Sequence, residues 1–111
     1  MLVAFDFGLT NTDIVISKSN KNQFHSFPTM EVNDEFISYI FDSISINVNQ
    51  ILQMAVTGGK SSDLDDNFND IPIKKVNEVG AIGSGAIALN DIGTRPFVAV
   101  SAGTGTACVY F

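Results

Sequence analysis

The spacing of apolar residues changes once along the chain, and this change limits the possible fold more than any other feature. Before it, three short apolar runs occupy residues 1–7, 14–17 and 23–27. Runs of this length joined by tight polar turns predict three consecutive strands. After it, apolar side chains recur every three or four residues, which predicts a helix capped by Asn33 or Asp34. The residues of that helical face are Phe36, Ile37, Ile40, Phe41 and Ile44.

Strands and helices then alternate. Residues 51–56 predict a buried strand, and the acidic residues 61–70 predict an exposed loop or short helix. Residues 71–76 predict another strand, in which Pro72 indicates an edge or an early position. Residues 77–90 predict a helix whose many glycines and alanines allow close packing. Alternation of this kind is typical of an α/β domain with a mixed sheet.

The last part of the chain repeats the pattern of the first. Residues 97–101 and 106–111 predict a hairpin, and both this hairpin and the opening one consist of a strand, a glycine–threonine turn and another strand. We therefore interpret residues 1–94 as one lobe, and residues 95–111 as the opening hairpin of a second, similar lobe.

The amino-acid composition limits the kinds of molecule that the chain is expected to bind. Of the 111 residues, 45% are hydrophobic and 16% charged, which supports a folded core and argues against wholesale disorder. Twelve acidic against six basic residues give a net charge of −6, so neither nucleic acid nor a membrane surface is an expected partner. The single cysteine, Cys108, permits no internal disulfide, and we expect a cytoplasmic protein.

The turn after the first strand has the residues of a phosphate site. Gly8 lets the backbone approach a ligand closely, and Thr10, Asn11 and Thr12 offer donors beside the turn amides. Asp6, at the end of the strand, is suited to hold a hydrated magnesium ion. An ordinary hairpin turn with a solvated aspartate explains this pattern equally well.

The turn of the closing hairpin repeats this chemistry. Gly103, Thr104, Gly105 and Thr106 again combine exposed amides with hydroxyl groups. Two such turns, at the two ends of a domain-sized stretch, are stronger evidence for phosphate binding than either turn alone.

A third glycine motif resembles a known phosphate-binding loop but lacks part of its pattern. Residues 59–61 imitate the end of a P-loop, but the glycine that should begin the motif is replaced by Met54, inside an apolar strand. The acidic residues that follow would also repel a triphosphate. We therefore reject a P-loop.

Glu78 stands at the head of the glycine-rich helix, directly after a strand. A carboxylate there can interact with the unpaired N–H groups of the first turn, and its position alone favours this capping role. The alternative is a general base that takes a proton from a substrate hydroxyl.

Taken together, these motifs resemble the first half of type II pantothenate kinases, which belong to the superfamily of actin, Hsp70 and sugar kinases. The resemblance extends along nearly the whole chain, and the glutamate-headed helix is its most specific part. The residues that carry it are Asp6 to Thr10, Thr57 to Gly59, Asn77 to Ala86 and Val100 to Thr106.

The resemblance implies a ribonuclease-H-like (actin-like ATPase) fold that binds ATP and Mg²⁺ between two lobes. Asp6 would face the metal, and both glycine–threonine turns would face the phosphates. Thr57, Gly58 and Gly59 would line the substrate cleft. Glu78 matches the family's catalytic carboxylate, which would activate the hydroxyl of pantothenate for attack on the γ-phosphate in the first step of coenzyme A biosynthesis.

Three departures from the family leave other functions open. Leu9 replaces a second glycine, Asp13 stands where some members have lysine, and Ala107 replaces a serine that would help hold pantothenate. The family's adenosine-binding segment also has no counterpart in these residues, so activity requires a second lobe from another chain or a second copy. The alternatives are a catalytically incomplete interaction or regulatory subunit, and a superfamily relative with another small-molecule substrate.

Overall fold

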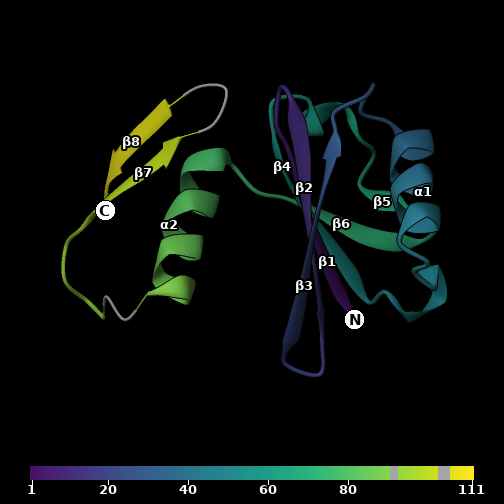
Figure 1. Ribbon diagram of the computed structural model, residues 1–111, viewed down its shortest axis with the longest axis horizontal. Helices are drawn as coiled ribbons and strands as arrows, with labels where there is room; N and C mark the ends of the chain where they lie inside the picture. The colour runs from purple at the N-terminus through teal and green to yellow at the C-terminus, as the bar shows by residue number, and fades with distance from the viewer. Residues whose placement is uncertain (91–92, 103–105) are drawn as a thin grey trace. The chain divides into compact units, whose positions relative to one another are not determined.

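A computed structural model describes residues 1–90, 93–102 and 106–111 (Figure 1). The chain forms two compact units, Met1–Lys75 and Val76–Phe111, and each is described by itself. The sequence division at residue 94 follows the order of the motifs rather than compactness, and it stays a prediction.

The first unit is built on a mixed sheet of six strands. Its strand order is β3-β2-β1-β4-β6-β5. Strands β1, β2 and β3 form an antiparallel meander, whereas β4 runs parallel to both β1 and β6, and β5 is antiparallel to β6. The strands are β1 Leu2–Phe7, β2 Asn11–Lys18, β3 Lys21–Pro28, β4 Gln53–Gly58, β5 Asn67–Phe68 and β6 Ile71–Lys75.

Helix α1 (Asp34–Ser43) covers one face of this sheet (Figure 1). Asn33 is its N-cap, because the side-chain oxygen of Asn33 accepts a hydrogen bond of 2.9 Å from the N–H of Phe36. Phe41 packs on Phe5 with ring centroids 5.7 Å apart, so the predicted helical face meets alternate residues of the strands. The core between them consists of Val3, Phe5, Phe7, Ile14, Ile16, Met54 and Val56 from the strands, and Phe36, Ile37, Ile40 and Phe41 from the helix.

The acidic segment contains the predicted short helix, a 3₁₀ helix (Ser61–Asp63), but it is not wholly exposed. It also contains strand β5, and two of its apolar side chains are buried, Leu64 at 5% and Phe68 at 3% exposure. The ammonium group of Lys75 holds the segment by donating to the carbonyls of Ser62 and Leu64. Pro72 lies early in β6 as predicted, but not at an edge, because β5 pairs with β6.

The second unit consists of one helix and one hairpin. Helix α2 (Glu78–Leu89) packs against the antiparallel pair β7 (Val98–Ala102) and β8 (Thr106–Tyr110). The rings of Phe97 and Phe111 stack at 5.2 Å, and their backbones exchange two hydrogen bonds at the open end of the hairpin.

Two side chains that are often buried in proteins lie on the surface here. Phe24 is 70% exposed because it sits on β3, the edge strand, opposite Val15 on the face that α1 does not cover. Cys108 is exposed on β8. Among the described residues, no helix is both long enough and apolar enough to cross a membrane.

Candidate functional site

The first glycine turn connects β1 to β2. A side chain at Gly8 would place its Cβ only 2.5 Å from the carbonyl oxygen of Asn11, so the turn requires glycine there. Thr10 and Asn11 are exposed at this turn, as a ligand-binding role requires. Asp6, at the carboxyl end of β1, is exposed as well.

Thr12 has a different environment from its neighbours. Its side chain is fully buried, and its hydroxyl lies 2.9 Å from that of Thr29. Because Thr29 gives its own hydroxyl proton to the carbonyl of Gly8 at 2.7 Å, Thr12 is the donor in the pair. Thr12 therefore supports the turn from the core side, and its hydroxyl is not open to a ligand in this structure.

Thr29 is a site-shaping residue that the sequence analysis missed. Besides its hydroxyl bond to Gly8, its backbone N–H donates to the carbonyl of Thr10 at 2.9 Å. It thus fixes the turn at both of its ends. Its position directly after β3 offered no signal of this role, which depends on strand pairing.

The carboxyl end of β4 lies beside this turn. Asp6 is in register with Thr57 of β4 and with Asp13 of β2. Since Phe5 and Phe7 point into the core with α1, the alternation along the strands directs Asp6, Asp13 and Thr57 to the opposite face. The sequence-predicted residues Asp6 and Thr57 are therefore brought together, and Asp13 joins them.

Gly58 follows Thr57 and has two requirements for glycine. Its φ is +101°, a region that other residues rarely adopt, and a Cβ there would overlap the backbone of Phe7. By contrast, Gly59 has open space around it. The next residues form no phosphate loop, because the hydroxyl of Ser61 donates to the carbonyl of Gly58 at 2.9 Å. The end of β4 is therefore tightly packed at Thr57 and Gly58 and open at Gly59.

Glu78 lies in the first turn of α2, in the second unit. The cap of this helix is Asn77, whose side-chain oxygen accepts a hydrogen bond of 2.7 Å from the N–H of Gly80. Glu78 itself is exposed. The capping role considered for Glu78 is therefore filled by its neighbour.

The second glycine–threonine turn is only partly described. Gly103, Thr104 and Gly105 lie outside the described residues. Thr106 is exposed at the start of β8, where it pairs with Ala102.

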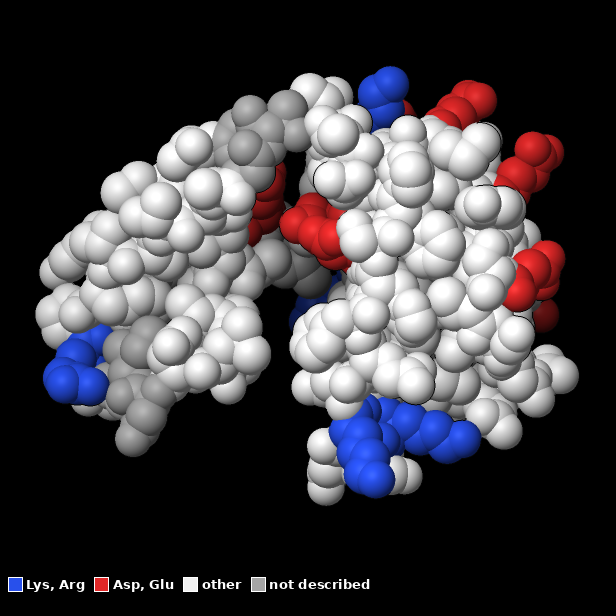
Figure 2. Space-filling model, in the orientation of Figure 1, with Lys and Arg blue, Asp and Glu red and all other residues white. Residues whose placement is uncertain are grey.

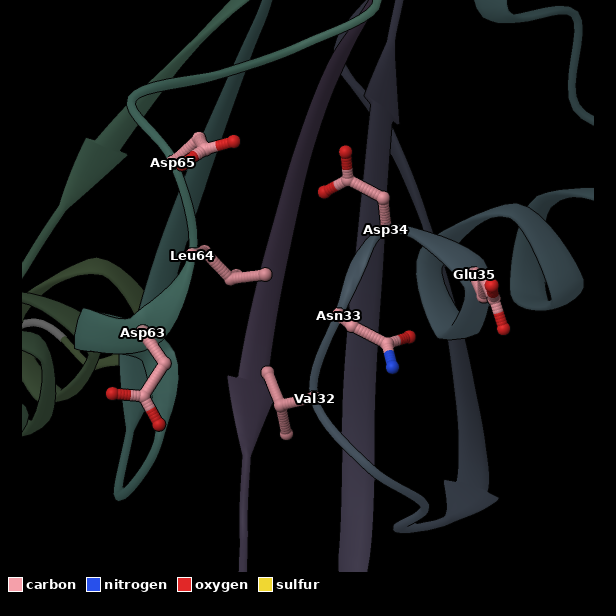
Figure 3. Close-up of a pocket in the computed structure, with 7 residues that line it drawn as sticks. All are labelled: Val32, Asn33, Asp34, Glu35, Asp63, Leu64 and Asp65. Atoms are coloured by element: carbon pink, nitrogen blue, oxygen red, sulfur yellow. The ribbon is translucent and has the colours of Figure 1, made fainter.

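A separate hollow lies between the start of α1 and the acidic segment (Figure 3). It has a volume of about 340 Å³ and is lined by seven residues, of which four are acidic: Asp34, Glu35, Asp63 and Asp65. Four carboxylates repel a phosphate, and the part of the chain that the structure describes contains no group of three or more acidic, histidine or cysteine residues arranged to hold a metal.

Charge is distributed unevenly on the first unit. Figure 2 shows acidic side chains over the α1 side and lysines at the end of the sheet where β2 turns into β3. The lysines that flank this turn are Lys18 and Lys21. The backbone amides and hydroxyl groups of the glycine turn are donors of the kind that a phosphate site needs.

Comparisons with known proteins give structural matches alone. No family model matches the sequence, and no curated protein matches it. The activator of the 2-hydroxyisocaproyl-CoA dehydratase from Clostridium difficile, solved with bound ADPNP, matches with a TM-score of 0.62 and 15% identity, over 87% of this chain and 36% of its own. YeaZ from Pseudomonas aeruginosa matches with a TM-score of 0.50 and 11% identity, over 96% of this chain and 58% of its own.

The chain thus spans 36% and 58% of the lengths of these two structures. Identities this low are informative about fold alone. The sheet of this chain combines the antiparallel strands β1, β2 and β3 with the parallel strands β4 and β6. The chain has the ribonuclease-H-like fold of the actin-like ATPases, as its sequence predicted.

Proposed function

We propose that this chain binds the phosphates of ATP, together with Mg²⁺, at the carboxyl ends of β1 and β4. The observation that carries the proposal is the alignment of Asp6, Asp13 and Thr57 on one face, beside the glycine turns at Gly8 and Gly58. Magnesium prefers oxygen ligands, keeps several waters and takes only one or two carboxylates from a protein. These residues fit a hydrated ion of that kind.

The phosphate contacts in this proposal come from two turns. Gly8, Thr10 and Asn11 present backbone and side-chain donors at the first turn, and Thr12 acts indirectly by fixing its geometry. Residues 103–106, of which 103–105 lie outside the described residues, would supply further phosphate contacts, as the sequence motif implies. Support for a nucleotide also comes from the dehydratase activator, which was solved with ADPNP. When bound, the metal would neutralise negative charge on the phosphates.

We further propose phosphoryl transfer to the hydroxyl group of a small molecule, with pantothenate as the acceptor that the family resemblance implies. Glu78 would accept the hydroxyl proton, and it is suited to this because it is exposed while Asn77 caps the helix. Thr57, Gly58 and Gly59 would line the cleft for the acceptor. The product would be a phosphate ester that begins coenzyme A biosynthesis in the cytoplasm.

A second lobe is part of this proposal. The hairpin presents an exposed apolar face, in which Val98 pairs with Tyr110 and Val100 pairs with Cys108. Apolar patches of this kind mark surfaces that another element covers. A second lobe would cover this face and supply the adenosine contacts.

The alternative is an ATPase-fold subunit that acts through protein contacts without phosphoryl transfer. One observation favours it: the match with the higher TM-score is an activator of another enzyme. In this case nucleotide binding would be retained, but no small-molecule acceptor would be phosphorylated.

The test is an ADP-release assay on the protein with any partner that co-purifies. Turnover that requires pantothenate, together with a loss of about 100-fold or more in Glu78→Gln at unchanged nucleotide affinity, would support the kinase. Glu31→Gln, which changes an exposed glutamate of the first unit, is the matched control. Nucleotide binding without turnover on any hydroxyl acceptor would favour the interaction subunit.

A further inference from the structure

Two buried threonines of the first unit differ in the state of their hydroxyl groups. Thr12 is fully buried and its hydroxyl has a partner at 2.9 Å. Thr57 is 9% exposed, and its Oγ1 atom is buried without a hydrogen-bond partner among the described residues. An unsatisfied buried hydroxyl is costly and uncommon in native proteins, and it needs a specific explanation.

The surroundings of Thr57 indicate which kind of group is missing. Its neighbour in register on β1 is Asp6, and the neighbour of Asp6 on β2 is Asp13, so the three side chains form one row on the same face. A bare phosphate would be repelled by two carboxylates. A hydrated cation is attracted by both carboxylates and offers water protons to a neutral hydroxyl oxygen.

We propose that the Thr57 hydroxyl accepts a hydrogen bond from a water molecule in the first shell of a magnesium ion held at Asp6. Thr57 is then a positioning residue that orients the hydrated ion, and it does not ligate the metal itself. The inference rests on the proposed function, since it requires that a magnesium–nucleotide complex binds at this edge of the sheet. Rotation about the Cα–Cβ bond of Thr57 would bring the covered hydroxyl to the water.

If Thr57 has this role, loss of its hydroxyl group affects the binding of Mg²⁺ but does not lower the stability of the ligand-free protein. Valine has nearly the shape of threonine but lacks the hydroxyl, so Thr57→Val removes an unsatisfied group from the ligand-free protein. We expect the unfolding temperature without ligand to stay the same or rise. In Thr12→Val, the matched control, a satisfied hydroxyl and the partner of Thr29 are lost, and the unfolding temperature should fall.

Nucleotide binding is tested separately. The affinity for ADPNP is measured by calorimetry on the full chain with any partner that co-purifies, once with excess Mg²⁺ and once with EDTA. Removing an outer-sphere partner lowers metal affinity by about 10-fold or more. Thr57→Val should therefore lose about that factor in the Mg²⁺-dependent part of the affinity, with the EDTA value unchanged, and Thr57→Ser should restore it.

The outcomes distinguish this inference from the function on which it rests. If the unsubstituted protein, together with any partner that co-purifies, binds no ADPNP in the presence of Mg²⁺, the proposed function fails and the role of Thr57 fails with it. If the unsubstituted chain binds but Thr57→Val binds equally well, only the role of Thr57 is overturned. A fall in the ligand-free unfolding temperature of Thr57→Val to match Thr12→Val would also overturn it, since the hydroxyl would then be structural.

Discussion

The two units of this chain bury their apolar residues very differently. In Met1–Lys75, a sheet and one helix enclose a continuous core of aromatic and aliphatic side chains. In Val76–Phe111, Ala99 is the buried hydrophobic residue among those described, while apolar side chains of both the helix and the hairpin stay exposed. The exposed ones are Val79, Ile87, Leu89, Val98, Val100 and Tyr110.

This difference follows from architecture rather than from composition. A sheet face can exclude water when a helix with a continuous apolar stripe covers it, as α1 does. A two-stranded hairpin beside a helix of small residues has too little surface to do the same. The first unit therefore has the packing of an independent domain, whereas the second leaves most of its large apolar side chains exposed.

The largest expected effect is on the core of the first unit. Phe41 is 1% exposed and contacts both Phe5 and Phe68, so Phe41→Ala should lower the free energy of unfolding by about 3–5 kcal/mol. Phe24→Ala makes the same chemical change at a 70% exposed position, and it should cost no more than about 0.5 kcal/mol. Urea denaturation followed by circular dichroism measures both. Equal losses would contradict the assignment of these two faces of the sheet.

The next effect concerns the backbone at the candidate site. Gly58→Ala combines a strained φ with an overlap on the backbone of Phe7, and it should destabilise the first unit by about 2 kcal/mol or more. Gly59→Ala, one residue away, has open space and should change stability by about 1 kcal/mol at most, with the favourable sign. Thermal unfolding of the pair is sufficient. A Gly59 variant as unstable as the Gly58 variant would show that the end of β4 has a different geometry.

Most of the fold could be predicted from the period of apolar residues, because burial on one face imposes that period. The exceptions arose where tertiary contacts override composition. Leu64 and Phe68 lie in a segment rich in aspartate, yet pairing of β5 with β6 buries them. Phe24 is a residue type that is usually buried, but it is exposed because β3 is an edge strand, which only the strand order shows.

The sequence predicted the glycine turns of the candidate site, but it predicted the roles of the threonine hydroxyl groups less well. The identity of the residue, threonine in both cases, does not distinguish Thr10, which is exposed, from Thr12, which is buried and supports the turn. The alternation of side chains along a strand could have predicted the burial of Thr12, since Thr12 and Ile14 lie on the same face of β2. The unsatisfied hydroxyl of Thr57 and the two contacts of Thr29 depend on pairing between distant strands, which local patterns do not contain.

A smaller effect tests the main packing contact of the second unit. A Cβ at Gly83 would overlap the ring of Phe111, whereas a Cβ at Gly85 would meet nothing. Gly85→Ala should therefore strengthen α2 by about 1 kcal/mol, the usual difference in helix propensity. Gly83→Ala should show none of this gain, because the ring has to move. Amide hydrogen exchange across α2 measures both, and an equal gain in the two variants would contradict the contact between helix and hairpin.

The smallest effect is expected on the exposed face of the hairpin. Val100 is 64% exposed, so Val100→Thr should change the stability of the second unit by no more than about 0.5 kcal/mol. Ala99→Thr places the same side chain on the covered face of β7 and should weaken the packing of the helix on the hairpin. Hydrogen exchange of α2 separates the two variants. If Val100→Thr weakened α2 as much as Ala99→Thr, the face that we assign to a second lobe would already be packed within this unit. If Val100→Thr leaves α2 unchanged but abolishes co-purification of a partner or dimerisation, that face is where the second lobe binds.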